Sequence, residues 1–436
     1  CQAYNIDPNL KVDSNKPSLF VRVRVTEAIL QQNNQNITST LSVTSGEPFN
    51  LTCVTGTSQP APILDWYIGS RFIGSGTSLN FTPSNTDHNE VIYCQAYNID
   101  PSLKVDSNKP SLFVTVQVSS ITLEGSTGGN MVFNEGYPQT LKCKSSPSRP
   151  VATIRWLLGN KYMMTNITNI NIIDGDGLYV LKSEITLVLM RNNSNQKIRC
   201  EGFIIGQGTL AISTEVIVDV RYAPDVSVNM QGSTLVGSNA VLMCAPQGNP
   251  PQYTFHPWIH RVGQTEIRRL DGVTTSNIST LTLSNISIQD DGTYICTVDN
   301  AVPGLDRQVI QMSDIYIYVQ GLPVFDKTQL TFAGEPNKSA NIEIPFYSYP
   351  SIKVVKFFNQ SDSLEISNTS NTAIYMSPAN ITMMFYNKKV MRPGHVAVLH
   401  FTNLRETDFG NYTLEISNDQ GTVSLQLDLI VLELSS

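Results

Sequence analysis

The sequence is poor in charge and in histidine, and it contains no long apolar run. Charged residues make up 15% of the 436 positions, and the formal net charge is -7. A nucleic-acid-binding protein needs a basic stripe that displaces counterions, so this acidic composition argues against nucleic acid as a partner. No stretch of 18 or more apolar residues occurs, so the sequence predicts no membrane-spanning helix.

Motifs of catalysis and metal binding are also missing. There is no G-x-S-x-G and no C-x2-C, and the five histidines are scattered. The acidic segment DGDG at 174–177 is predicted to be a tight turn, because Ile185 stands where an EF-hand loop needs glutamate. The segment GSTGGN at 125–130 lacks the Lys-Ser/Thr of a phosphate loop. We therefore expect no enzymatic activity, no cofactor and no small-molecule substrate.

What the sequence does contain is one spacing that occurs three times. A cysteine is followed 13 or 14 residues later by a tryptophan, and then by a second cysteine. The three sets are Cys53, Trp66 and Cys94; Cys143, Trp156 and Cys200; and Cys244, Trp258 and Cys296. Segments around them, such as PFNLTCV and QTLKCKS, alternate apolar and polar residues, which predicts β-strands.

A second motif, D-x-G-x-Y-x-C, appears once in full and once without its cysteine. The full motif consists of Asp290, Gly292, Tyr294 and Cys296. Its counterpart consists of Asp408, Gly410 and Tyr412, with Leu414 in the cysteine place. The glycine permits a corner turn, and the tyrosine hydroxyl can bond back across it. Upstream of the second motif, Ile344 with Phe357, or Ile342 with Val355, fits the places of the first cysteine and the tryptophan.

These motifs are similar to those of the immunoglobulin superfamily, of the I-set or C2 kind. The segment CAPQGNPPQYTFHPW resembles hemicentin- and nephrin-like modules, and EITLVLMRNNSNQKIRCEG resembles nectin-like modules. The resemblance implies an all-β fold of tandem immunoglobulin-like β-sandwich domains in an extended array. It also implies that each cysteine pair bridges two sheets beside its tryptophan, namely Cys53–Cys94, Cys143–Cys200 and Cys244–Cys296.

The seventh cysteine, Cys1, is left unpaired by this scheme. Residues 1–25 agree with residues 94–118 at 22 of 25 positions, so they are expected to be the end of a preceding domain. The domains expected after that remnant are 26–118, 119–221 (C2-type), 222–320 (I-set or C2) and 321–436, the last without a disulfide. Pro224 is expected to break strand continuity at the 221/222 junction.

Twelve N-x-S/T sequons support the oxidising, secretory compartment that the disulfides imply. Their asparagines are Asn36, Asn50, Asn80, Asn166, Asn192, Asn277, Asn285, Asn337, Asn359, Asn368, Asn380 and Asn411. Since neighbours of inward-pointing strand residues point outward, Asn80 and Asn411 are expected to face solvent. The absence of a signal peptide leads us to expect that the chain is part of a longer protein, with a membrane anchor in a missing C-terminal part.

The sequence thus predicts an extracellular or cell-surface protein that binds other proteins, homophilically or heterophilically, through its immunoglobulin-like domains. Sheet faces free of glycans are expected to hold the contact surface. Tyr67 and Tyr253 could be interface anchors, and Arg261, Arg268 and Arg269 are expected on a solvated face. A soluble immune-type recognition protein and the ectodomain of a receptor enzyme remain alternatives.

Overall fold

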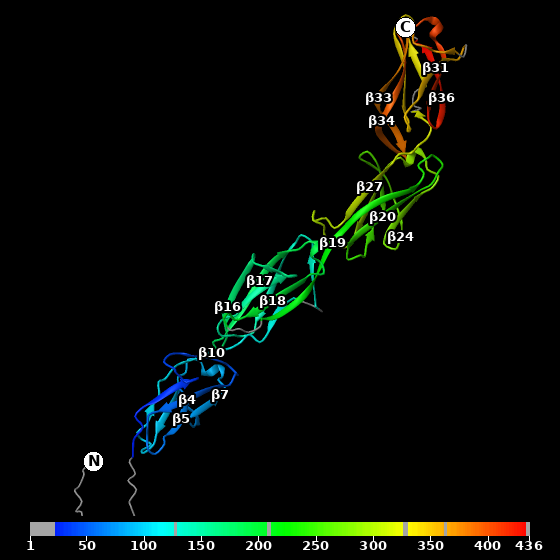
Figure 1. Ribbon diagram of the computed structural model, residues 1–436. Coiled ribbons are helices and arrows are strands. Elements are labelled where there is room, and N and C mark those ends of the chain that lie inside the picture. Colours follow the sequence, from blue (N-terminus) through cyan, green and yellow to red (C-terminus); the bar gives the residue numbers. More distant parts are fainter. Residues whose placement is uncertain (1–21, 126–128, 207–210, 326–329, 362–363, 433–436) are drawn as a thin grey trace, which may run out of the picture. The chain divides into compact units, whose positions relative to one another are not determined.

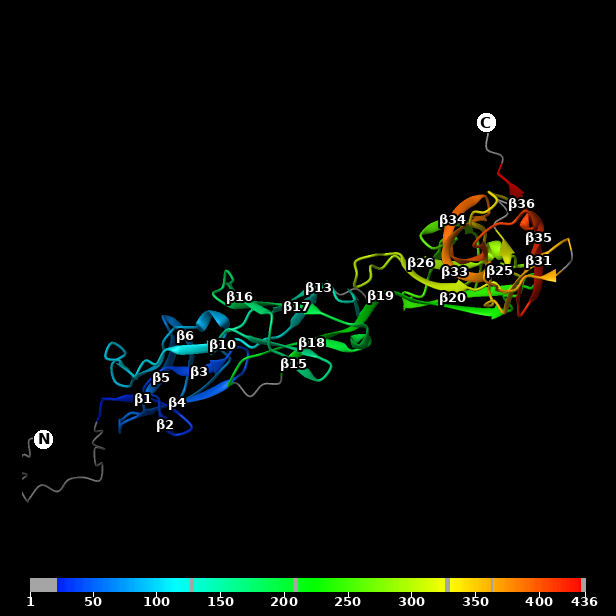
Figure 2. The same ribbon diagram turned by 90° about the horizontal axis from the view of Figure 1, so that it is seen from above.

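The structure is a computed structural model that describes residues 22–125, 129–206, 211–325, 330–361 and 364–432. These residues form β-strands and four short 3₁₀ turns, which build four two-layered β-sandwiches (Figures 1 and 2). The chain divides into two compact units. The first comprises residues 1–131, 138–188 and 193–219, and the second comprises 132–137, 189–192 and 220–436.

Sandwich 1 contains ten strands and one 3₁₀ turn, η1 (Asn85–Asp87). The strands are β1 (Ala28–Gln32), β2 (Gln35–Asn36), β3 (Leu41–Thr44), β4 (Phe49–Thr55), β5 (Ile63–Ile68), β6 (Arg71–Ser75), β7 (Ser78–Phe81), β8 (Ile92–Tyr97), β9 (Val105–Asp106) and β10 (Leu112–Thr115). One sheet has the order β2-β1-β4-β7 and the other β6-β5-β8-β9, while β10 runs parallel to β3. The residues that alternate inward along β4, β5 and β8 lie in the buried core, together with inward residues of β1, β3, β7 and β10.

Sandwich 2 repeats this arrangement with longer strands and the turn η2 (Arg191–Asn193). Its strands are β11 (Ile121–Glu124), β12 (Asn130–Asn134), β13 (Pro138–Ser145), β14 (Thr153–Leu158), β15 (Lys161–Met163), β16 (Ile167–Ile173), β17 (Tyr179–Val188), β18 (Lys197–Phe203) and the first part of β19 (Ile212–Gly232). One sheet has the order β11-β13-β17-β16, and the other runs β15-β14-β18-β19.

The expectation that Pro224 breaks the strand is wrong, because β19 continues through it. The ladder between β19 and β20 (Ala240–Asn249) shifts register between Tyr222 and Asp225. The proline lies inside this irregularity, where its missing N–H removes no ladder hydrogen bond. Gly248 lies opposite, and a Cβ there would be 3.0 Å from the Pro224 Cα, so a side chain at this position would crowd the bulge.

Sandwich 3 is built from the second part of β19 and seven further strands besides β20, with the turn η3 (Ile288–Asp290). The seven are β21 (Thr254–Phe255), β22 (Trp258–Val262), β23 (Thr265–Leu270), β24 (Val273–Thr275), β25 (Ile278–Leu283), β26 (Gly292–Asp299) and β27 (Gln311–Ile317). One sheet runs β19-β20-β25-β24, and the other runs β21-β26-β22-β23 with β27 on β26.

Sandwich 4 contains nine strands and the turn η4 (Glu406–Asp408). The strands are β28 (Val324–Phe325), β29 (Thr331–Gly334), β30 (Ala340–Tyr347), β31 (Val354–Asn359), β32 (Leu364–Glu365), β33 (Thr372–Phe385), β34 (Lys388–Phe401), β35 (Gly410–Asn418) and β36 (Gly421–Val431). The sheets have the orders β28-β30-β34-β33 and β29-β36-β35-β31-β32. The two 14-residue strands β33 and β34 form the long hairpin in Figure 1.

The core of sandwich 4 has apolar side chains in place of the disulfide and of the tryptophan–serine hydrogen bond found in sandwiches 2 and 3. Trp156 Nε1 donates to the Ser183 hydroxyl over 2.9 Å, and Trp258 Nε1 donates to Ser279 over 3.1 Å. In sandwich 4, Phe357 pairs with Leu414, just as Trp156 pairs with Cys200. The strand residue opposite Ile344 is Ala397, where Ser183 lies opposite Cys143. Donor and acceptor are lost together, so this replacement leaves neither an indole N–H nor a hydroxyl unpaired at these positions.

In three of the sandwiches, an asparagine side chain donates hydrogen bonds to the segment that enters the sandwich. The asparagine lies four residues after the second cysteine, or after Leu414 in sandwich 4. Asn98 Nδ2 donates to the carbonyls of Val23 and Pro60, at 2.7 and 3.0 Å. Asn300 does the same to Tyr222 and Pro250, and Asn418 to Gly321 and Pro350. In sandwich 2 the equivalent position is Ile204. One amide therefore holds both the incoming segment and a neighbouring turn in place.

Candidate recognition surface

Each of the first three sandwiches has a disulfide between its two sheets. The Cα–Cα distances are 6.2 Å for Cys53–Cys94, 6.6 Å for Cys143–Cys200 and 6.3 Å for Cys244–Cys296. The three indoles beside these bridges are at most 1% exposed: Trp66, Trp156 and Trp258. Cys1 lies outside the described residues. These groups form the interior of the sandwiches, so they hold the scaffold and leave recognition to the surface.

The corner of sandwich 3 is closed by a tyrosine. The Tyr294 hydroxyl donates to the Asp290 carbonyl over 3.1 Å. Gly292 has φ +143°, and a Cβ there would lie 2.4 Å from the Arg261 carbonyl oxygen, so the position requires glycine. The turn is further held by the Asp290 carboxylate, which accepts from the Ser287 N–H over 2.8 Å.

The corner of sandwich 4 has the same construction, and those of sandwiches 1 and 2 do not. The Tyr412 hydroxyl donates to the Asp408 carbonyl, and Gly410 again has φ +143°. Ile92 and Ile198 occupy the tyrosine places in sandwiches 1 and 2, and both are buried. These two corners therefore lack the tyrosine hydrogen bond and rely on other contacts of their turns.

The sequon asparagines are exposed, with Asn359 half-buried. In sandwich 1 all three lie on one sheet: Asn36 on β2, Asn50 on β4 and Asn80 on β7. Asn50 and Asn80 are directly opposite each other in the β4–β7 ladder. Glycans on these side chains would cover this sheet, whereas the described strands of the β6-β5-β8-β9 sheet contain no sequon asparagine.

The sheet of sandwich 1 whose described strands contain no sequon asparagine carries aromatic side chains on its outer face. Tyr67 on β5 stacks with Tyr93 on β8 at 5.4 Å between ring centroids, and it meets Phe72 on β6 edge-on at 5.8 Å. Phe72 is 55% exposed and Ile63 is 51% exposed. Since rings of this size and rigidity are the usual anchors of protein interfaces, this cluster can supply the centre of a contact.

Charged groups surround the aromatic cluster. Lys109 Nζ lies 4.2 Å from the centroid of the Tyr93 ring and 2.7 Å from a carboxylate oxygen of Asp106. Burial alone raises the pKa of Asp106, but the hydrogen bonds from Lys109 and Gln95 outweigh it, so the pKa lies below its ordinary value. The same contact with Asp106 raises the pKa of Lys109. Lys104 lies 5.3 Å above the Tyr97 ring. The face therefore combines an apolar centre with an ionised rim, as in a protein interface.

We refer to Ile63, Tyr67, Phe72, Tyr93, Tyr97, Lys104 and Lys109 together as the aromatic face. Of these, only Tyr67 was among the anchors expected from the sequence. Tyr67 belongs to the half-buried residues that alternate with buried Leu64, Trp66 and Ile68. Assigning each sequon to its strand, and then looking at the outward residues of the other sheet, would have pointed to the rest.

Tyr253, Arg268, Arg269 and Asp174 have structural partners, while Arg261 is half-buried. The Tyr253 hydroxyl accepts from the Gly248 N–H over 2.7 Å and so holds a turn. Arg269 pairs with Glu266, and Arg268 pairs with Asp290 at 2.5 Å with a side chain only 23% exposed. The expectation of a solvated face is therefore wrong for Arg268. The Asp174 carboxylate accepts from the N–H groups of Asp176 and Leu178, which is the predicted turn.

Within the described ranges, no cluster of three or more histidine, cysteine, aspartate or glutamate side chains has the geometry of a metal site. In the same ranges, no helix is long and apolar enough to span a membrane.

Comparison with known proteins finds two family models in the chain. Residues 223–300 match a model described as an immunoglobulin domain, and residues 121–204 match one described as a CD80-like C2-set immunoglobulin domain. Both matches fall on sandwiches whose sheets are joined by a disulfide.

Curated relatives extend the similarity along the chain. Nephrin of Mus musculus is 26% identical over 227 residues, covering 48% of this chain and 17% of nephrin. Neural cell adhesion molecule 1 of Mus musculus is 29% identical over 208 residues, covering 47% of this chain and 16% of the relative. Kin of IRRE-like protein 2 of Mus musculus is 23% identical over 400 residues, covering 85% of this chain and 49% of the relative. The chain thus spans half or less of the length of these relatives.

Proposed function

The chain belongs to the immunoglobulin superfamily, and from this premise we propose that it is an extracellular adhesion or recognition protein that binds another protein through the aromatic face of sandwich 1. Its role is binding rather than catalysis. The partner is a protein, either a second copy of the chain or a different immunoglobulin-type ectodomain. The relatives include neural cell adhesion molecule 1, whose name states adhesion. A cell-surface location, with an anchor in a part of the protein beyond this chain, is part of the proposal.

The positions of the sequons in sandwich 1 are the reason for choosing this surface. In sandwich 1 the three sequon asparagines lie on one sheet, and the aromatic face lies on the other. Glycans block protein contact wherever they are attached, because they are bulky and hydrated. The exposed Phe72 ring and the half-buried Tyr67 ring beside it would otherwise leave apolar area in water, and burial against a partner would stabilise the complex.

A glycan wedge tests the proposal. The substitution Ser75→Asn creates the sequon Asn-Gly-Thr at the end of β6, beside the aromatic face. Ser75 is exposed, so the sandwich should fold with the added sugar. Beads coated with the glycosylated chain are assayed for self-aggregation and for binding to a panel of purified immunoglobulin-type ectodomains. We expect the wedge to abolish the binding that the wild-type chain shows.

The matched control is Asn80→Gln, which removes a sugar from the opposite sheet and should leave binding unchanged. Mass spectrometry must show that the new site is occupied. Undiminished binding by a chain that is fully glycosylated at position 75 would place the contact elsewhere and overturn the proposal.

A further inference from the structure

The hairpin β33–β34 extends beyond the sheet to which it belongs. Its two strands pair with each other from Thr372↔Phe401 to Phe385↔Lys388. The neighbouring strand β30 pairs with β34 only between Phe401 and His395. Among the described residues, the half of the hairpin from Gly394 to its tip therefore has no third strand beside it. This half packs against sandwich 3 within the second unit.

The first contact of this free half is apolar. Phe385 and Val390 form a small buried core with Val262 and Ile267 of sandwich 3, and Met383 packs against it. Each of the four buried side chains is at most 4% exposed. Side chains of both sandwiches thus contribute to one buried core.

The second contact is a buried carboxylate that both sandwiches satisfy. Asp291 is fully buried, and its carboxylate accepts from the Arg392 guanidinium at 3.0 Å and the Tyr347 hydroxyl at 3.3 Å, both of sandwich 4. Sandwich 3 provides the Tyr316 hydroxyl at 2.8 Å and the Val319 N–H at 3.1 Å. The Arg392 guanidinium also lies 3.6 Å from the centroid of the Tyr347 ring. A buried carboxylate is stable only with such partners, so the third sandwich depends on the fourth.

The third contact is made by the tip of the hairpin. Tyr386 and Asn387 form the two-residue turn, with φ +40° and +67°. A left-handed conformation is unfavourable for tyrosine and persists only when the surroundings hold it. Here the Tyr386 hydroxyl donates to Asp290 over 2.6 Å, and Arg268 lies 3.8 Å above its ring. The turn therefore uses a residue that suits the contact with the corner of sandwich 3 and does not suit the turn itself.

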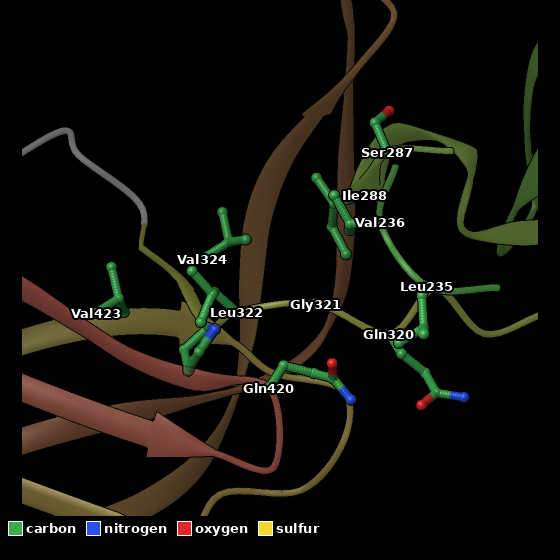
Figure 3. Close-up of a pocket in the computed structure, with 11 residues that line it drawn as sticks. Leu235, Val236, Ser287, Ile288, Gln320, Gly321, Leu322, Val324, Gln420 and Val423 are labelled. Carbon is green, nitrogen blue, oxygen red and sulfur yellow. The ribbon is translucent and has the colours of Figure 1, made fainter. Parts of the chain in front are cut away.

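The linker between the two sandwiches is hydrogen-bonded on both sides. The Gln320 N–H donates to Thr234 of sandwich 3 over 2.9 Å, and the Gly321 N–H donates to Tyr349 of sandwich 4 over 3.0 Å. A hollow of about 610 Å³ lies beside it, and Figure 3 shows Val236 and Ile288 on one side and Leu322 on the other. The linker thus joins the two sandwiches by backbone hydrogen bonds beside this hollow, whereas the hairpin contributes a buried apolar core and a buried ion pair.

We propose that sandwiches 3 and 4 form a single cooperative unit, in which the β33–β34 hairpin clasps the corner of sandwich 3 through Tyr386, Arg392 and Asp291. The two sandwiches keep one fixed relation and open together. A pull or a binding event on sandwich 4 is carried through the hairpin into the corner of sandwich 3, and the linker does not absorb it.

Hydrogen–deuterium exchange on the full, disulfide-intact chain tests the clasp. The key variant is Tyr386→Asn, because asparagine suits the left-handed turn and so favours the isolated hairpin. If the clasp operates, this variant exchanges faster in sandwich 3, at η3 and β26, by at least about tenfold, since hydrogen bonds to charged groups are lost. Arg392→Met should have the same remote effect.

The matched control is Lys389→Met, which removes a charge from an exposed position on the same hairpin and should leave exchange in sandwich 3 unchanged. Faster exchange at η3 and β26 in both clasp variants, with none in the control, supports the proposal. Exchange that changes only within sandwich 4, or a Tyr386→Asn chain protected as well as wild type throughout, would overturn it.

Discussion

The Arg392 guanidinium donates to the Asp291 carboxylate over 3.0 Å, although the two residues are 101 positions apart and lie on different sandwiches. Their side chains are 8% and 0% exposed, so the pair is removed from water. Removing one partner of a buried ion pair leaves an uncompensated charge, which is far more costly than losing an exposed pair.

Asp291→Ala should therefore lower the free energy of unfolding of sandwich 3 by about 3–5 kcal/mol. The quantity to measure is the exchange free energy of the β26 amides, because a chain of several sandwiches does not unfold in one step. Asp314→Ala, on the exposed side of β27, is the control and should cost less than about 0.5 kcal/mol. Equal decreases in the free energy of unfolding for the two variants would show that the buried ion pair stabilises sandwich 3 no more than an exposed carboxylate does.

Tyr412→Phe should destabilise sandwich 4 by about 1 kcal/mol, because the Asp408 carbonyl loses its donor. Tyr294→Phe should cost sandwich 3 more, since the Tyr294 hydroxyl also accepts from Arg268 over 3.3 Å. Denaturant titration followed by exchange in β35 and β26 distinguishes the two sandwiches. The reverse order of costs would contradict this account of the corners.

Acid should weaken sandwich 3 through His260. Burial lowers the pKa of this histidine from 6.5 to about 4. Between these pH values the unfolded chain binds a proton that the folded chain does not. The contribution of neutral His260 to the free energy of unfolding is therefore fully present above about pH 6.5, and it is lost as the pH falls toward 4. The loss amounts to about 3 kcal/mol.

Exchange in β22 and β26 as a function of pH measures this loss, after correction for the intrinsic rate. His260→Gln should flatten the dependence between pH 4 and 6.5, whereas His400→Gln, on sandwich 4, should not. An unchanged slope in His260→Gln would assign the acid sensitivity to other groups.

Phe72→Ala should weaken partner binding by about tenfold or more. Sandwich 1 should remain folded, because the Phe72 ring is 55% exposed and does not belong to the hydrophobic core of the sandwich. Tyr375→Ala, which removes a 48% exposed ring from sandwich 4, should leave binding unchanged. Bead aggregation or surface plasmon resonance with the identified partner gives the affinities. A loss in both variants would mean that exposed aromatic area contributes without regard to position.

Thiol titration tests the cysteine assignment. Seven cysteines less the six in the three bridges leave one thiol, on Cys1. Under denaturing and non-reducing conditions, the 436-residue chain should react with one equivalent of a thiol reagent. Three or more equivalents would contradict the pairing.

The sequence by itself was enough for the fold class and for the inward residues of each sandwich. Local patterns carry this information, because a period of two places Cys53, Leu51 and Phe49 on one side of a strand whatever the strand packs against. The same reasoning placed Asn80 and Asn411 outward, and both are exposed. For the tryptophan place of sandwich 4 the sequence left Phe357 and Val355 as alternatives, and the structure pairs Phe357 with Leu414, the residue in the cysteine place.

Local rules failed where a distant segment supplied the partner. Pro224 predicts a strand break by itself, but the register shift opposite Gly248 accommodates it within β19. The grouping of three sequons on one sheet of sandwich 1 depends on which strands pair, and the pairing of β2, β1, β4 and β7 is not a property of any one segment. The aromatic face follows from the same pairing.

The sequence therefore determined that this protein consists of β-sandwiches with outward-facing sequon asparagines, because burial and alternation act over a few neighbouring residues. Only the tertiary structure decided which sheet of sandwich 1 carries no sequon asparagine and which charges are buried. Nothing in the local segments of Asp291 and Arg392 distinguishes them from other charged residues. They form a buried ion pair only because the hairpin brings them together. The electrostatic energy of such a pair depends on the distance between the charges and on the exclusion of water, and neither can be predicted from the local sequence.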